Sequence, residues 1–203
     1  MPYASSIDNE KIYYEVLGDG DISLVFIGGL GVPTGRDFWT NQLEFASKYK
    51  LILIDLAGYG KLDNGRKIHT MQLYGQDVKA VVEELDLKDV ILIGISMGGV
   101  VILEAEKLIP ERTIGLIPID SLLLDSPSFY TSHDEEQTEI FWKSYEEDLN
   151  NYENDILPFD KRVVKSGSRE LYKWDFRDIL PEIEKPIKCI IAERTLPTKQ
   201  QQD

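Results

Sequence analysis

Ser96 stands in a sequence setting that suits a nucleophile. It occupies the centre of Gly94-Ile95-Ser96-Met97-Gly98, after the apolar run Val90 to Ile93 and before a helical pattern from about Gly99 to Ile109. A strand that turns sharply into a helix lifts the serine hydroxyl above a sheet, and small flanking residues leave room for the turn. The backbone N–H of Met97 then points toward a negative charge that develops on a substrate oxygen. This pattern predicts attack by Ser96 on a carbonyl carbon; the alternative is a bystander serine in a glycine-rich turn.

A serine nucleophile also needs a general base and an acid that orients the base. Asp120 follows the apolar run Ile114 to Ile119 and is a candidate for the acid, or else a simple loop cap. Of the two histidines, His69 precedes a predicted helix and is more simply an exposed loop residue or a contact at the entry to that helix. His133 lies in a predicted helical region that is more simply a solvated surface. The residues therefore leave the base unassigned.

Alternating strand and helix patterns surround the serine. The predicted strands are Lys11 to Val16, Ile22 to Ile27, Lys50 to Asp55, Val90 to Ile93, Ile114 to Ile119 and Pro186 to Ala192. The predicted helices run from about Phe38 to Lys48, from the N-cap Thr70 to Leu85, and from Gly99 to Ile109. Continuous apolar strands between helices favour a parallel sheet covered on both faces. The turns Gly28-Gly29, Gly58-Tyr59-Gly60 and Gly94 to Gly98 then meet at the carboxyl ends of the strands, where such sheets bind ligands.

Between Ser121 and Leu180 the sequence becomes acidic and aromatic, with helical spacing and no strand-like run. We interpret this stretch as a helical lid. The predicted organisation is a core over residues 1–120, an inserted lid over 121–180, and a last core strand with a polar tail over 181–203. Several aromatic side chains either line a pocket under the lid or attach the lid to the core: Tyr130, Phe141, Trp142, Tyr145 and Trp174.

In their order along the chain these features resemble the α/β-hydrolase family. Asn9 to Glu15 is similar to the family's N-terminal hairpin, Leu24 to Leu30 to its strand and oxyanion loop, and Asp55 to Gly60 to its Asp-x-x-Gly-x-Gly turn. The resemblance implies an α/β fold with a mostly parallel, doubly wound sheet and an inserted lid. It also implies a serine hydrolase that acts on a carboxylic ester or amide of a small molecule through an acyl-enzyme on Ser96.

Two positions depart from the family pattern. The oxyanion loop commonly reads His-Gly, whereas this chain has Gly28-Gly29. By position, Leu30 is expected to supply a second backbone donor beside Met97, with Gly29 shaping the loop; a plain tight turn is the alternative. The family's base histidine follows one strand beyond the penultimate one, and no histidine lies beyond His133. We therefore expect a C-terminally truncated hydrolase. The alternatives are an impaired hydrolase that acts as a binding module, or a site completed by a second chain.

Composition excludes several classes of partner. The net charge of -14 disfavours nucleic acid and anionic membrane surfaces, and no apolar run approaches the ~20 residues that span a bilayer. With no signal-peptide pattern, a cytoplasmic location is expected. The single cysteine, Cys189, is expected to be buried, and no cofactor and no metal site are expected. Without a further strand, residues 186–192 would form an exposed sheet edge with a tendency to self-associate.

Overall fold

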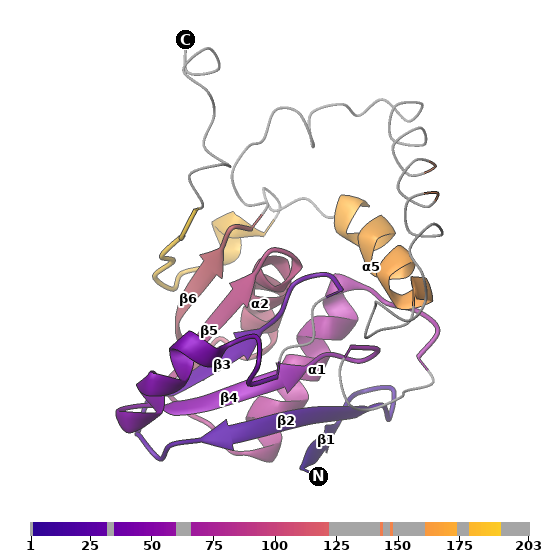
Figure 1. Ribbon diagram of the computed structural model, residues 1–203. Helices are drawn as coiled ribbons and strands as arrows, with labels where there is room; N and C mark the ends of the chain where they lie inside the picture. Colours follow the sequence, from indigo (N-terminus) through magenta and orange to yellow (C-terminus); the bar gives the residue numbers. More distant parts are fainter. Residues whose placement is uncertain are drawn as a thin grey trace.

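Figure 1 shows the computed structural model of the 203-residue chain. The structure describes residues 2–31, 35–59, 66–121, 143, 147, 161–173 and 179–191. The strands are β1 (Tyr3–Ser5), β2 (Lys11–Leu17), β3 (Ser23–Ile27), β4 (Lys50–Asp55), β5 (Val90–Ile95) and β6 (Thr113–Ile119). The helices are η1 (Thr40–Ser47, 3-10), α1 (Met71–Glu84), α2 (Met97–Leu108), α5 (Lys161–Lys173) and η3 (Leu180–Glu182, 3-10).

The six strands form one sheet in the order β1-β2-β4-β3-β5-β6. The pairs β1–β2 and β2–β4 are antiparallel, whereas β4, β3, β5 and β6 run parallel to one another. The predicted mostly parallel α/β sheet is therefore confirmed. Its parallel strands end together at one edge, so the loops that follow β3, β4, β5 and β6 meet there (Figure 1).

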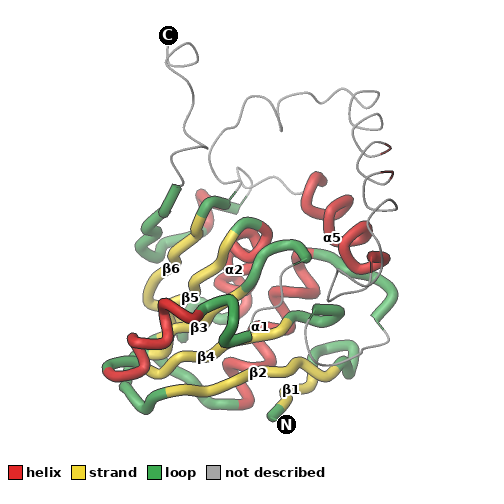
Figure 2. The backbone as a smooth tube through the Cα atoms, in the orientation of Figure 1, coloured by secondary structure: helices red, strands yellow, loops and turns green. Residues whose placement is uncertain are grey.

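Alternate residues of the central strands enter two separate apolar cores. In β4, Ile52 and Ile54 pack with buried residues of α1 and α2, while Leu51 and Leu53 pack with Trp39 on the opposite face. This alternation follows from the two-residue period of a strand. Figure 2 shows α1 and α2 behind the strands and η1 in front of them. Both faces of the sheet are covered, as the continuously apolar strands predicted.

Thr70 caps α1 as expected, because its side chain accepts a hydrogen bond from the Leu73 N–H at 3.1 Å. Other boundaries differ from the predictions. The helix expected from Phe38 is a 3-10 helix that begins at Thr40, and α2 begins at Met97 rather than Gly99. The three-residue strand β1 was not predicted, because so short a segment carries too little periodicity.

Residues 187–190 continue the sheet beyond β6, with parallel bridges from Leu116 to Ile187 and from Ile119 to Ile190. The expected burial of Cys189 is wrong. Cys189 is exposed, since the segment lies at the outer edge of the described sheet and has one neighbouring strand.

The lid expected over 121–180 lies mostly outside the described residues, and so do the aromatic residues assigned to it. Of this region the structure describes α5, whose Val163, Val164, Ser168 and Leu171 are buried along one face. The division into core, lid and tail therefore stays a prediction. In the described part of the chain no helix is long and apolar enough to cross a membrane.

Candidate active site

Ser96 lies between β5 and α2 with a left-handed backbone, φ 52° and ψ −117°. Such a conformation costs a non-glycine residue about 1–3 kcal/mol and persists only where the surroundings hold it. Two contacts from the end of β6 provide that support. The Ser96 N–H donates to the Ile119 carbonyl at 2.9 Å, and the Ser121 hydroxyl donates to the Ser96 carbonyl at 2.9 Å. The turn is thus fixed through the peptide groups on both sides of Ser96.

Glycines make this turn sterically possible. A methyl group on Gly94 would collide with the backbone of Gly98, and one on Gly99 would collide with the side chain of Ser121. A methyl group on Gly98 would lie 2.5 Å from the Gly28 carbonyl oxygen. These close approaches are the physical reason for the small residues around Ser96.

The contact between Gly98 and Gly28 brings the loop after β3 against the start of α2. Met97 is fully buried at the first position of that helix, and Gly29 is buried in the loop. Leu30 is half-buried and packs against the core beneath α5. The two residues expected to donate to an oxyanion therefore belong to segments that touch, while their role stays a prediction.

Asp120 is brought to the same edge of the sheet as Ser96. In the β5–β6 register Ile95 pairs with Ile119, so Ser96 and Asp120 each follow directly on a paired residue. Asp120 has a positive φ of 44°, and its N–H donates to the Ile190 carbonyl at 2.7 Å. The proximity suits the predicted acid, but it does not test that role.

Of the two interpretations of His69, the exposed loop residue is wrong, because only 3% of its surface is accessible. Its Nε2 lies 3.1 Å from the Arg66 carbonyl oxygen, which can only accept, so Nε2 carries the proton. Its Nδ1 lies 3.0 Å from the Tyr74 hydroxyl, which therefore donates. These bonds tie Nε2 to the segment before α1 and Nδ1 to α1 itself, so His69 is a contact at the entry to that helix. His69 has a structural role there, which argues against its use as the general base.

An ion-pair cluster that the sequence analysis missed anchors this segment. The Arg66 guanidinium binds Asp77 through two bonds of 2.7 and 2.8 Å, and binds Asp8 through two bonds of 2.8 and 2.9 Å. Asp77 also accepts from the Ser6 hydroxyl at 2.6 Å and from the Ala57 N–H at 3.2 Å. The sequence feature that could have indicated this cluster is Asp77, an acidic residue on the otherwise apolar face of α1.

The pKa values of the two carboxylates in this cluster shift in opposite directions. Burial raises the pKa of Asp77 above its usual value, although the bonds from Arg66, Ser6 and Ala57 oppose the change. Burial also acts to raise the pKa of Asp8, but there the hydrogen bonds and charge of Arg66, together with bonds from the Glu10 and Asp8 backbone, outweigh it and the pKa is lowered. The difference follows exposure, since the Asp77 side chain is fully buried and that of Asp8 is one third exposed.

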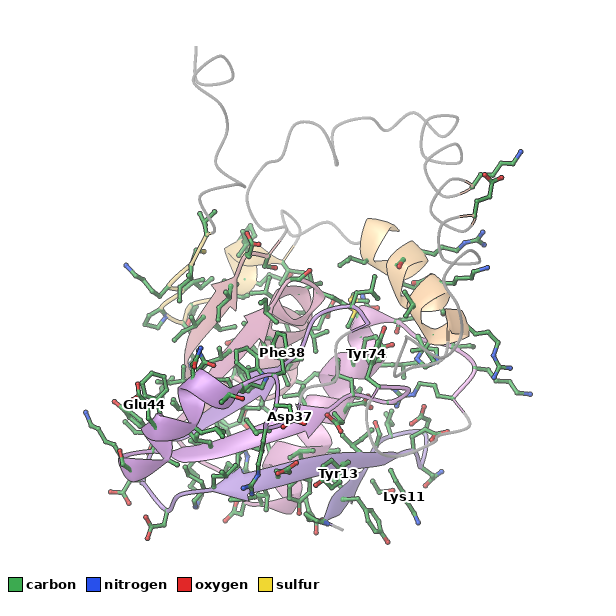
Figure 3. All side chains as sticks on the ribbon, in the orientation of Figure 1. Lys11, Tyr13, Asp37, Phe38, Glu44 and Tyr74 are labelled. Atoms are coloured by element: carbon green, nitrogen blue, oxygen red, sulfur yellow. The ribbon has the colours of Figure 1, made fainter. Side chains whose placement is uncertain are left out.

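Helix α5 covers the loops after β3 and β4. Val163 lies against Gly58, and a methyl group on Gly167 would lie 3.1 Å from Leu30 Cδ1 and 3.2 Å from the Tyr59 hydroxyl. Tyr74, labelled in Figure 3 on α1, lies beneath this contact, and burial raises the pKa of its hydroxyl well above the usual value. α5 therefore packs directly on the loop that carries Leu30.

The other histidine, His133, which the sequence analysis interprets as part of a solvated surface, lies outside the described residues. Within the described ranges, no group of three or more His, Cys, Asp or Glu side chains could hold a metal ion.

The chain is similar in sequence to curated proteins. The chain is 37% identical over 102 residues to a non-heme chloroperoxidase of Burkholderia pyrrocinia, a match that covers 49% of this chain and 36% of that protein. It is 32% identical over 127 residues to a pimeloyl-[acyl-carrier protein] methyl ester esterase of Yersinia enterocolitica, covering 62% of this chain and 45% of that protein. The chain thus spans less than half the length of these two curated relatives.

Solved structures agree in fold. An esterase from Exiguobacterium antarcticum superimposes with a TM-score of 0.74 at 20% identity, over 92% of this chain and 79% of that one. An enol-lactonase from Burkholderia xenovorans superimposes with a TM-score of 0.73 at 17% identity, over 95% and 81% of the two chains. The family model described as "Alpha/beta hydrolase family" matches residues 24–186. Because that match extends over well over half of the sequence, the chain belongs to the alpha/beta hydrolase family.

Proposed function

We propose that this chain carries the nucleophile of a serine hydrolase acting on a carboxylic ester or amide of a small molecule. The observation that carries the proposal is the strained backbone of Ser96, held between β5 and α2 by bonds from the end of β6. Residues with a strained backbone cluster at active sites and persist where the surrounding structure holds them. The names of the relatives, among them an esterase and a lactonase, support the same class of reaction.

In the proposed reaction the Ser96 oxygen attacks the carbonyl carbon and loses its proton to a base. The carbonyl electron pair moves onto oxygen, where the N–H groups of Met97 and Leu30 would stabilise the negative charge. The intermediate then reforms the carbonyl and expels the alcohol or amine, which takes up the proton. Water attacks the resulting ester of Ser96 by the same route and releases the acid. Asp120 is the proposed orienting acid, and the base is not assigned.

Covalent labelling tests this proposal directly. A fluorophosphonate probe should label the wild-type chain and fail to label Ser96→Ala, since the probe reacts with an activated serine hydroxyl. Ser47→Ala is the matched control, because the Ser47 hydroxyl is exposed on η1 and donates to the Glu44 carbonyl at 2.8 Å. It should be labelled like the wild type. Equal labelling of Ser96→Ala and wild type would refute the assignment.

The second candidate is a hydrolase-derived binding module, or a chain whose site a second chain completes. The observation behind it is the structural role of His69, the histidine that the structure describes. Turnover of an activated nitrophenyl ester, measured beside the labelling, separates the candidates. Binding of the ester without labelling or turnover would support the binding module. Turnover by the isolated chain that is lost in Ser96→Ala would refute the binding module. Restoration of turnover by a second polypeptide would indicate a completed site.

A further inference from the structure

Gly167 lies in the interior of α5, where a glycine lowers helix stability by about 1 kcal/mol relative to alanine. What the missing side chain permits at this position is a close approach. A methyl group on Gly167 would lie 3.1 Å from Leu30 Cδ1 and 3.2 Å from the Tyr59 hydroxyl oxygen, and both distances are tighter than ordinary van der Waals contact. The glycine therefore lets the α5 backbone rest directly on the loops that follow β3 and β4.

The same face of α5 contacts the loop after β4 one helical turn earlier. Val163 precedes Gly167 by four positions, so the two residues lie on one side of the helix. A methyl group on Gly58 would lie 2.8 Å from both γ carbons of Val163 and 3.0 Å from His69 Cε1. The loop after β4 is therefore confined between α5 and the segment before α1, and it supports the first half of the helix.

The two side chains beneath Gly167 differ in how easily they can move. Tyr59 is 2% exposed, and its ring centre lies 6.0 Å from that of the fully buried Tyr74. The Tyr74 hydroxyl is bonded in turn to His69. Leu30 is half-buried, and the end of its side chain is the part that meets α5. A residue larger than glycine at position 167 would therefore displace Leu30 rather than Tyr59.

Leu30 is the residue whose backbone is the proposed second oxyanion donor. Among the described residues, no backbone carbonyl accepts a hydrogen bond from the Leu30 N–H. The loop is fixed before Leu30, where the Gly28 carbonyl oxygen lies against Gly98 of α2. It turns directly after Leu30, where Gly31 has a positive φ of 71°. The contact from α5 acts on the residue between these two points.

We propose that Gly167 is a positioning residue for the oxyanion donor: through its contact with the Leu30 side chain, the α5 backbone sets the place of the Leu30 N–H. This inference rests on the proposed function, and it gives α5 a part in the rate of the reaction. An oxyanion donor is effective at about 2.7–3.1 Å from the developing charge. A methyl group on Gly167 would require its neighbour to move by a few tenths of an ångström, which is enough to weaken such a bond. Gly167 acts through Leu30 and not on the reacting atoms.

An exchange of volume between positions 167 and 30 tests this proposal through the second-order rate constant of fluorophosphonate labelling, because the phosphonyl oxygen also gains negative charge beside Ser96. Gly167→Ala should lower this rate constant by about tenfold, since loss of a whole donor costs about 10²–10³ and a displacement costs less. Leu30→Val keeps the backbone N–H but shortens the side chain, and it should also lower the rate because the contact with α5 is lost. The double variant restores the volume at the contact and should return to within about threefold of the wild type.

Two controls separate positioning from a general loss of structure. Gly115→Ala adds the same methyl group where the nearest neighbour is 3.6 Å away, so it should be labelled at the wild-type rate. In Gly167→Ala the gain in helix propensity, about 1 kcal/mol, offsets the steric cost, so the midpoint of urea unfolding should change little. Slower labelling at an unchanged midpoint, with recovery in the double variant, is not expected of a residue that only stabilises α5.

Two results would overturn this proposal. One is labelling of Gly167→Ala at the wild-type rate, and the other is a double variant in which the two losses multiply instead of cancelling. If Gly167→Ala does not fold, Leu30→Val alone decides, and a wild-type rate in that variant would overturn the proposal. In each of these cases Ser96 of the wild type is still labelled, so the proposed function stands. Absence of labelling in the wild type would instead refute the proposed function and this inference together.

Discussion

Loss of the Arg66 guanidinium should be one of the most destabilising changes in the described core. The Arg66 side chain is 2% exposed and its partner Asp77 is fully buried. Removing one member of a buried pair leaves an uncompensated charge, and Arg66→Ala should lower the free energy of unfolding by about 3–5 kcal/mol. Arg36→Ala, which breaks an exposed ion pair with Glu15, should cost no more than about 1 kcal/mol. Urea unfolding monitored by circular dichroism measures both.

The pH dependence of this destabilisation gives a further test. Burial raises the pKa of Asp77 from 3.8, against the opposing effect of Arg66, so removing Arg66 should raise that pKa further. A carboxyl group whose pKa is higher in the folded state destabilises that state when it is ionised, and this penalty is lost as the pH falls through the folded pKa toward the unfolded one. The cost of Arg66→Ala should therefore be larger near pH ~8 than near pH ~5.

The double variant Arg66→Met, Asp77→Leu removes both charges. It should be more stable than Arg66→Ala, since no unpaired charge stays buried. Two results would refute the reasoning. One is a double variant as unstable as Arg66→Ala, and the other is a cost of Arg66→Ala that grows at acid pH.

Two further predictions concern the site and its support. Gly98→Ala places a methyl group 2.5 Å from the Gly28 carbonyl oxygen, so it should abolish fluorophosphonate labelling and cost about 1–3 kcal/mol. Gly115→Ala, whose methyl group would have 3.6 Å to its nearest neighbour, should leave labelling intact; equal labelling of the two variants would contradict the steric argument. Tyr74→Phe removes the hydroxyl that donates to His69 Nδ1 and should cost about 1–3 kcal/mol in urea unfolding. Tyr3→Phe, at an exposed tyrosine, should change stability by less than about 0.5 kcal/mol, and a similar loss in both variants would argue against the His69 bond.

The sequence by itself was sufficient to predict the local features of the fold. Continuous apolar runs predicted the parallel strands, and the Thr70 cap predicted the start of α1. The spacing of glycines around Ser96 predicted a sharp strand-to-helix turn, which the structure shows at that residue. These features depend on neighbours in the chain, so periodicity, capping and turn chemistry reveal them.

Other features were decided by contacts between residues far apart in the sequence. Arg66 binds Asp8 and Asp77, which are 58 and 11 positions away, and this cluster draws the segment before α1 inward. His69 lies in this segment and is buried, although the two residues before it, Lys67 and Ile68, are exposed. Cys189 stands in an apolar run yet is exposed, because its segment pairs with β6 at the edge of the sheet as the structure describes it. Local pattern determined which segments form strands, helices and the Ser96 turn; tertiary contacts alone decided which polar groups are buried and which edge is accessible.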